Sequence, residues 1–565
     1  MKRMHLKYVL LLCWIIFINL DMLGQSFDVS AERAKSLSNM ADFYYTAGNY
    51  DKAIELEQES KKMIGELFGY KSFEYATSAL TIAKYYFSKG RNDASCPQNI
   101  IEQNFSKAIN NLKIIIRVTN DSLLTNYDKL DSRDRYLLWQ QVCPLYDRLF
   151  PCYVACFQND STVSDLYNIV LFSKGITWRN YNEAIKADWR NIQKKLHSDE
   201  IAIEFISPVD LDVENIIYYA LIIRKDRVAP YMIKLFDLMQ LNESLERASS
   251  KYEKDLQLGK LIWGALESEM NGIKNIYFSA THVLHNIPIE YLPINRSSFY
   301  SEKYNMYRLS STLDLTNNTK TQYKHAVLYG GLEYDSIIDD KTERNKSLNR
   351  AGLEALLNTG IEISEISKLL QAQGVNCKSY LGHSGDETSF RSLSGKEINI
   401  LHLSTHGQYN LYEESSYYFN EGKALSHTYL AFSGVNKKLI DPLIDERNDG
   451  IVTAQDISEM VFHALDLVCL SACDSALGTL SDDDGILGLQ KGFKKAGANT
   501  ILMSLDKVDD EATRNLMVEF YKNLMSGKTK HQSLKDAQKY LRQVDNGKYD
   551  KPEYWASFIM LDGLN

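Results

Sequence analysis

Two apolar stretches of the sequence each end at a side chain that can take part in nucleophilic catalysis. Residues 398–407 read Ile-Asn-Ile-Leu-His-Leu-Ser-Thr-His-Gly and bring His406 to the end of the run, and residues 465–478 bring Cys473 to a similar position. An imidazole can accept the proton of a thiol and so hold a reactive thiolate near neutral pH. A thiol and an imidazole at one site would therefore be the parts of a cysteine nucleophile. The sequence alone does not show that they meet.

The elements that must position these two residues are predicted to be neighbouring buried strands. Near-continuous aliphatic and β-branched runs bounded by small residues are typical of a parallel sheet that is covered on both faces. In such sheets, ligands bind at the carboxyl ends of the strands. His406 and Cys473 both fall at that end of their runs. We therefore expect a site at the carboxyl edge of a parallel sheet.

Strands and helices alternate through the chain after His197, and this pattern predicts a mostly parallel sheet with right-handed crossovers. The region Glu413–Arg447 is long for a connection and is expected to be a loop with short strands near the site. The other predicted strands are 201–206, 216–223, 228–235, 275–279, 326–330, 375–380, 500–504 and 555–561. The predicted helices are 241–252, 259–270, 361–373, 387–393, 485–495, 509–525 and 532–544.

Residues 30–195 form a helical and repetitive region. A pattern of Ala, two aromatics and Gly48 recurs at Gly90, a period of 42 residues, with an insertion near 91–103 in the second copy. Small residues let paired helices approach, aromatics fill the groove between them, and the Gly is expected to close the turn, as in tetratricopeptide-type repeats. Two recognisable copies are few, so a plain helical bundle remains an alternative.

The first 25 residues have the layout of a secretory signal peptide, with a basic start, an apolar run over 8–20 and a small, polar end. An uncleaved membrane anchor and a buried helix are the alternatives, although the run is short of the roughly 20 residues that span a bilayer. No other stretch approaches a membrane span. We therefore expect an exported protein, periplasmic or secreted, with no membrane attachment once the signal is removed.

The charge of the chain indicates what kind of partner it binds. The net charge is −9 and the basic residues are scattered, which argues against nucleic acid and favours a protein or peptide partner.

Removal of the first 25 residues would leave seven cysteines, an odd number, and Cys473 is the natural free thiol. Cys469 is expected to pack as a small apolar residue inside a strand. Cys152 and Cys156 are expected on one helix, where they lie too far apart for a relaxed disulfide. No metal-type spacing of Cys and His occurs, and no cofactor is expected.

Eight blocks of the second half of the sequence form a recognisable series: Ile287–Leu292, Arg308–Ser311, Thr359–Ile363, Leu401–Gly407, Asp449–Ile457, Leu470–Gly478, Gly488–Gly497 and Pro552–Ile559. In this order, the blocks resemble the CHAT family of caspase-like peptidases that accompany tetratricopeptide repeats. The resemblance implies a caspase-hemoglobinase type fold over 200–565, with a strand-rich part at 200–330 and a His-Cys dyad in 331–565. The helical repeats would bind a protein partner.

The resemblance also implies roles for individual residues. His406 and Cys473 would be the catalytic dyad of a cysteine endopeptidase, and the N–H groups of Gly407 and Cys473 would donate to the oxyanion. No third member of the dyad is evident. A catalytically silent CHAT-fold interaction module is the alternative function. His402 lies four residues before His406 and is expected to be a hydrogen-bonded core residue and not a metal ligand.

The chain departs from the family pattern at Ser504-Leu505-Asp506-Lys507, where the family usually shows Ser-Leu-Trp. A carboxylate beside the specificity pocket, from Asp506 or from Asp474, would favour cleavage after Arg or Lys. Alternatively, Asp506 caps the helix that opens at Asp509-Asp510, or the loss of the Trp leaves the pocket malformed.

Overall fold

The structure is a computed structural model of the 565-residue chain. It describes residues 29–92, 97–126, 138–139, 141–174, 176, 179, 187–209, 215–247, 256–295, 298–317, 321–334, 353–409, 425–426, 428–440, 448–471, 484–506 and 508–565. The predicted signal segment, Cys473 and Asp474 lie outside these residues. In the ranges that are described, no helix is both long enough and apolar enough to cross a membrane.

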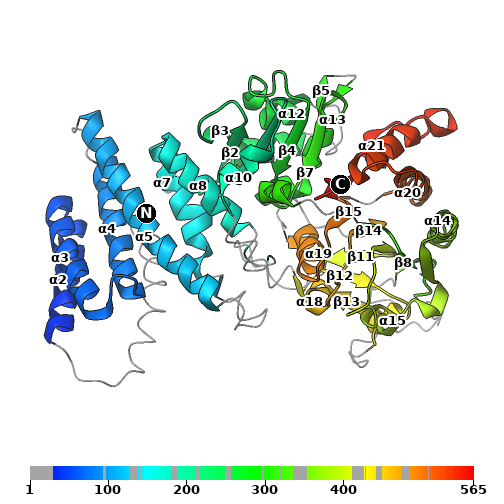
Figure 1. The fold of residues 1–565 in the computed structure, drawn as a ribbon, viewed down its shortest axis with the longest axis horizontal. Coiled ribbons are helices and arrows are strands. Elements are labelled where there is room, and N and C mark those ends of the chain that lie inside the picture. The colour runs from blue at the N-terminus through cyan, green and yellow to red at the C-terminus, as the bar shows by residue number, and fades with distance from the viewer. Residues whose placement is uncertain are drawn as a thin grey trace, which may run out of the picture. The chain divides into compact units, whose positions relative to one another are not determined.

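The chain divides into two compact units (Figure 1). The first contains the residues up to Trp189 together with 206–221 and 227–238, and the second contains 190–205, 222–226 and everything from Met239 onward. Two strands therefore group largely with the helices of the first unit. They are β2 (Ile217–Arg224) and β3 (Tyr231–Asp237).

Helices build most of the first unit, and they are α2 (Val29–Thr46), α3 (Tyr50–Phe68), α4 (Phe73–Asn92), α5 (Gln98–Asn126), α7 (Phe150–Cys156), α8 (Asp160–Ser173) and the π-helix η2 (Leu145–Leu149). Consecutive helices pack on one another, α2 on α3, α3 on α4 and α4 on α5. Tyr45 of α2 stacks on Tyr85 of α4 with ring centroids 4.8 Å apart. The predicted helical, tetratricopeptide-like architecture of this region is confirmed.

The two repeat glycines have different roles. Gly48 adopts φ +80° in the turn between α2 and α3, a conformation that favours glycine, as expected. Gly90 lies inside α4, so the prediction that it closes a turn is wrong. A Cβ on Gly90 would lie 3.1 Å from the ring of Phe105 in α5. Gly90 therefore serves the close packing of α4 on α5.

Nine of the eleven strands of the large sheet lie mainly in the second unit, in the spatial order β1-β4-β7-β16-β15-β14-β10-β8-β9. Strands β1, β4, β7 and β16 run parallel to one another, and so do β15, β14, β10, β8 and β9. The two sets meet antiparallel at β15 and β16. The predicted mostly parallel sheet is therefore confirmed, with one reversal. The bounds are β1 (Glu200–Ile206), β4 (Asn275–Ser279), β7 (Asn305–Arg308), β8 (His325–Tyr329), β9 (Asn376–Tyr380), β10 (Ile400–Ser404), β14 (Leu467–Ser471), β15 (Thr500–Ser504) and β16 (Phe558–Leu561).

Two smaller sheets accompany the large one. Strands β11 (Gly407–Tyr409), β12 (Thr428–Ala431) and β13 (Ile451–Thr453) form an antiparallel sheet directly after β10. Strands β5 (Pro293–Asn295) and β6 (Ser298–Phe299) form a two-stranded pair. Part of the region 413–447 thus contains the expected short strand, β12, and much of the rest lies outside the described residues.

The helices from residue 189 onward are mostly short, and several are 3-10 turns. The α-helices are α10 (Trp189–Lys195), α11 (Leu238–Arg247), α12 (Leu256–Trp263), α13 (Tyr300–Lys303), α14 (Thr359–Ala372), α15 (Glu387–Arg391), α17 (Val435–Ile440), α18 (Ala454–Glu459), α19 (Asp484–Lys495), α20 (Asp510–Met525), α21 (Lys530–Leu541) and α22 (Pro552–Trp555). The 3-10 helices are η3 (Gly264–Leu266), η4 (His282–Asn286), η5 (Ile289–Tyr291), η6 (Thr312–Thr316), η8 (Gly382–Ser384) and η9 (Val544–Gly547).

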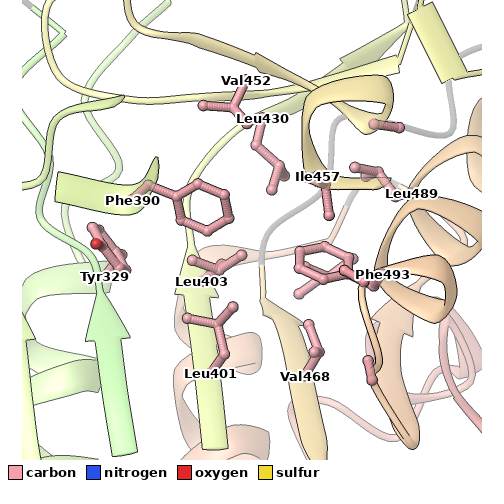
Figure 2. Packing of buried hydrophobic residues seen from close by; sticks show 14 of the residues in the cluster. Tyr329, Phe390, Leu401, Leu403, Leu430, Val452, Ile457, Val468, Leu489 and Phe493 are labelled. Atoms are coloured by element: carbon pink, nitrogen blue, oxygen red, sulfur yellow. The ribbon is translucent and has the colours of Figure 1, made fainter. Parts of the chain in front are cut away.

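Alternate residues of β10 and β14 enter two different cores. Leu401, Leu403 and Val468 pack with Phe390, Ile457 and Phe493 from α15, α18 and α19, beneath Leu430 and Val452 of the small sheet (Figure 2). Ile400, Leu467 and Cys469 pack on the opposite face with α14, α20 and α21. A strand covered on both faces is apolar at every position except where a side chain has a buried hydrogen-bond partner. This explains the long apolar runs in the sequence.

The sequence predictions for this unit differ from the structure at several elements. The helix predicted at 259–270 ends at Trp263 and is followed only by the 3-10 helix η3. The last strand begins at Phe558 and not at Trp555, because Pro552–Trp555 form the short helix α22. Strand β7, in the interior of the sheet, was not predicted, since Asn-Met-Tyr-Arg is too short and too polar to show an apolar run.

Candidate functional site

The register of two strands defines the place of the candidate site. Strands β10 and β14 pair in parallel, and their last partners are Ser404 and Ser471. His406 is the second residue after Ser404, and Cys473 is the second residue after Ser471. The chain therefore leaves the same edge of the sheet, at the same level, toward both residues. Cys473 itself lies outside the described residues.

The His406 imidazole is buried and held by a backbone carbonyl. His406 is 7% exposed, and its Nε2 lies 2.8 Å from the carbonyl oxygen of Glu354. A carbonyl oxygen can only accept a hydrogen bond, so Nε2 carries the proton in this arrangement. The neutral ring then has its lone pair on Nδ1, and Nδ1 is the nitrogen that can act as a base.

Tyr334 packs against the same imidazole. The two rings have centroids 5.2 Å apart at an angle of 52°. The Tyr334 hydroxyl lies 2.7 Å from Oγ1 of Thr405, and Thr405 in turn donates to the carbonyl of Ala431. Burial raises the pKa of Tyr334 to about 12, an effect that the bond to Thr405 only partly offsets. Tyr334 is therefore a neutral wall of the site near neutral pH.

The backbone on the far side of His406 is fixed by the small sheet. Gly407 opens β11 and lies opposite Leu430 of β12, and the N–H of Ala431 donates to the carbonyl of His406 over 2.9 Å. The peptide that carries the Gly407 N–H, the predicted oxyanion donor, is thus part of a strand. A donor on a regular element is held more firmly than one on an irregular loop.

A buried carboxylate joins the two strands just below the site. Glu362 of α14 is fully buried, and its Oε1 accepts from Nε2 of His402 at 2.8 Å and from Oγ of Ser471 at 2.7 Å. Its Oε2 accepts from Oγ of Ser404 at 3.3 Å. One side chain of α14 therefore contacts the last residue of β10 and the last residue of β14.

His402 and Cys469 have structural roles, as predicted. His402 is fully buried and bonded to Glu362, and its Nδ1 lies 3.3 Å from the Tyr521 hydroxyl. That hydroxyl also donates to Sγ of Cys469 over 3.2 Å. Burial raises the pKa of Cys469 to about 12, so this thiol is a poor nucleophile at neutral pH. Across the described ranges, no group of three His, Cys, Asp or Glu side chains could hold a metal ion.

Asp506 follows β15, the strand on the other side of β14 from β10. It is half-buried, its N–H donates to Oγ of Ser504, and Ser504 donates back to its carbonyl. The alternative that Asp506 caps the next helix is wrong, because Asp509 is the N-cap of α20 and accepts from the N–H of Ala512 over 2.8 Å. The second specificity candidate, Asp474, lies outside the described residues.

Sequence reasoning missed the partners of His406. The Glu354 contact is made by a backbone carbonyl, which leaves no trace in side-chain chemistry. Tyr334 lies far from His406 in the sequence and carries no motif. Glu362 falls within the block Thr359–Ile363 that contributed to the family resemblance, so a signal existed for it, but not one that showed its role.

Comparison with known proteins gives three further observations. A stretch of 111 residues, 20% of this chain, is 29% identical to tetratricopeptide repeat protein 28 of Mus musculus and covers only 4% of that protein. The crystal structure of the Arg-specific cysteine proteinase gingipain R aligns with 56% of this chain and 69% of its own, at 10% identity and a TM-score of 0.35. The Saccharomyces cerevisiae separase–securin complex aligns with 94% of this chain and 44% of that chain, at 9% identity and a TM-score of 0.41. Both TM-scores are below 0.5.

The family model gives the decisive match. The model of the CHAT domain matches residues 256–563, which is more than half of the chain. These residues contain both strands that define the site, together with His406 and Cys473. The chain belongs to the CHAT domain family.

Proposed function

We propose that this protein is a cysteine endopeptidase in which Cys473 is the nucleophile and His406 is the general base. The observation that carries the proposal is the register of β10 and β14, from which His406 and Cys473 each follow by two residues. The tautomer set by Glu354 supports it, because a base needs a lone pair and Nδ1 has one. Membership of the CHAT family agrees with a caspase-like peptidase fold.

The chemistry proceeds in two halves. Nδ1 of His406 takes the proton of the Cys473 thiol as the sulfur attacks the scissile carbonyl and forms the S–C bond. The N–H groups of Gly407 and Cys473 donate to the oxyanion. The imidazolium then gives its proton to the leaving amine as the C–N bond breaks. Water, deprotonated by the same imidazole, releases the acyl group and restores the thiol.

The substrate is proposed to carry Arg or Lys before the cut. Asp506 is half-buried and follows β15, the strand next to β14, and Asp509 and not Asp506 caps α20. A carboxylate at that position would attract a basic side chain by a charge-assisted hydrogen bond. Asp474, the residue after the nucleophile, is the second candidate for this contact.

The remaining parts of the proposal concern partners and location. The helical repeats of the first unit are proposed to bind a protein partner or the substrate, as paired-helix repeats commonly do. Residues 1–25 are proposed to direct export and to be removed afterwards, because of their basic start and short apolar run.

Labelling with a peptide electrophile tests the proposed activity directly. The full chain is treated with an acyloxymethyl ketone peptide that ends in Arg, and the labelled residue is identified by mass spectrometry. Cys473 should carry the label, and Cys473→Ala and His406→Ala should lose labelling and at least about three decades of peptide turnover. The exposed Cys156 provides the matched control, because Cys156→Ala should change neither.

Two results would contradict the proposal. A folded Cys473→Ala protein that cleaves at the parent rate would exclude Cys473 as the nucleophile. A folded parent protein that neither reacts nor cleaves any member of a peptide library would favour the alternative function, a catalytically silent interaction module.

A further inference from the structure

The carbonyl that orients His406 belongs to an irregular segment. Residues 353–358 form neither helix nor strand, and Glu354 is exposed to solvent apart from this carbonyl contact. Regular hydrogen bonding therefore does not fix the position of the Glu354 oxygen. An irregular segment keeps one conformation only where side chains hold its backbone groups.

One buried side chain holds the residue just before Glu354. Asn436, in the first turn of α17, is 2% exposed. Its Oδ1 accepts from the N–H of Leu353 over 2.7 Å, and its Nδ2 donates to the carbonyl of Leu353 over 3.0 Å. The amide thus pairs with both backbone groups of one residue, as a neighbouring strand would. These partners also fix the orientation of the amide, because an N–H only donates and a carbonyl only accepts.

The same residue supports the other neighbour of the imidazole. The backbone N–H of Asn436 donates to the carbonyl of Tyr334 over 3.2 Å, and the N–H of Gly434 donates to the carbonyl of Glu333 over 3.2 Å. Tyr334 is the ring that packs on His406. The turn at 434–436 therefore holds both groups that contact the imidazole, the carbonyl through Leu353 and the ring through Tyr334.

We propose that Asn436 is a positioning residue that fixes the Glu354 carbonyl, and through it the Nε2–H tautomer of His406. Asn436 does not touch the reacting atoms. Its importance for turnover rests on the proposed peptidase function, whereas its effect on the tautomer does not. The chain separates Asn436 from Leu353 by 83 residues and from His406 by 30, so no local motif shows this connection.

An amide is the side chain that this contact requires. Asp in place of Asn keeps the acceptor for the Leu353 N–H but has no donor, so it sets an oxygen against the Leu353 carbonyl. Ala removes both bonds. Asn436→Asp and Asn436→Ala should therefore release the Glu354 carbonyl to different degrees, with little change in volume for the Asp variant.

Histidine-selective ¹⁵N labelling of the full chain gives a readout that does not depend on activity. The two nitrogens of a neutral imidazole have different ¹⁵N shifts according to which one is protonated, and His406→Gln identifies the signals of His406. The parent protein should show the Nε2–H tautomer alone. Asn436→Ala should show a mixture of both tautomers. Where turnover is measurable, kcat should fall about 100-fold with KM changed by less than about threefold, because positioning and not ground-state binding is lost.

Asn399 provides the matched control. It is also a buried amide that brackets backbone groups, since Oδ1 accepts from the N–H groups of Lys324 and His325 and Nδ2 donates to the carbonyl of Ala464. It lies at the opposite end of β10, just before Ile400. Asn399→Ala should destabilise the fold, as followed by thermal unfolding, and leave the His406 tautomer unchanged.

The outcomes separate this inference from the proposed peptidase activity. A single Nε2–H tautomer in folded Asn436→Ala would overturn the role of Asn436, whatever the activity. So would the same mixture in Asn399→Ala, because the effect would then be general loosening. A parent protein that shows the Nε2–H tautomer but no turnover, together with a tautomer mixture in Asn436→Ala, would support the inference and contradict the proposed function.

Discussion

Replacing Glu362 by Ala should loosen the two strands that lead to His406 and Cys473. The Glu362 carboxylate accepts two strong hydrogen bonds, at 2.8 Å from His402 and 2.7 Å from Ser471, and a weaker one at 3.3 Å from Ser404. All these groups are almost completely buried, so water does not replace the lost acceptor at once. A buried donor left without a partner costs about 1–3 kcal/mol. Two strong bonds therefore predict a loss of about 3 kcal/mol or more, in line with the cost of breaking a buried pair.

Native-state hydrogen exchange followed by mass spectrometry measures this loss where it occurs. The two units need not unfold together, so a single global unfolding curve would be hard to assign. A loss of about 3 kcal/mol corresponds to roughly a 100-fold increase in exchange rate. We expect this increase in peptides that cover 400–404 and 467–471. Glu362→Gln keeps the shape and one acceptor and should show a much smaller change.

Glu204 offers a matched comparison in the other half of the sheet. It is fully buried in the second half of β1 and accepts from Oγ of Ser311 and from the N–H and Oγ1 of Thr312. Glu204→Ala should speed exchange in peptides around residues 200–206 and leave 400–404 unchanged. Exchange in Glu362→Ala within about threefold of the parent over both site strands would refute the reasoning, because a gap of that size is below 1 kcal/mol.

Four further predictions concern pH, specificity and processing. Burial raises the pKa of Glu57 to about 7, so this group favours folding below about pH 4.5 and that contribution is lost as the pH rises to 7; Glu57→Gln should be more stable than the parent at pH 8, by about 3 kcal/mol, in denaturant titrations of the first unit. Burial lowers the pKa of His531 to about 4, so its contribution is present above pH 6.5 and is lost as the pH falls toward 4; His531→Gln should show a flatter fall of melting temperature over that range, and equal slopes would count against this. Asp506→Asn or Asp474→Asn should weaken a preference for Arg or Lys in peptide-library cleavage, and a basic preference that survives both changes would exclude these carboxylates. N-terminal sequencing of exported protein should find a start close to Ser26, and a retained first residue would contradict signal removal.

The sequence by itself determined the strands that lead to the site. Residues 400–404 and 467–471 are apolar except at His402, Ser404 and Ser471, because each strand is covered on both faces by the hydrophobic core. The predicted strands at 275–279 and 500–504 agree with the structure residue for residue for the same reason. His406 stands out because a reactive side chain directly follows such a run.

Tertiary structure decided what holds His406 in place. Its partner is the carbonyl of Glu354, and every residue has a carbonyl, so composition and spacing say nothing about it. Asn436 and Leu353 are 83 residues apart in the sequence, and Glu362 and His402 are 40 apart. Helical or strand periodicity relates residues only a few positions apart, so it could not predict either contact. Asp509 and not Asp506 caps α20 because the helix begins at Asp510, and the sequence does not fix the start of a helix to within one turn.

The sequence determined the strands but not the contacts of His406, because these two features depend on residues at very different separations along the chain. Hydrophobic periodicity reports the faces that a single element buries, and those faces are set by residues two to four positions apart. The orientation of the His406 imidazole is set by a hydrogen bond to a distant part of the chain, and the two groups come together only when the sheet and its helices have packed. Strand β7, four residues long in the interior of the sheet, shows the same limit for the fold, because its place depends on its neighbours β4 and β16 and not on its own sequence.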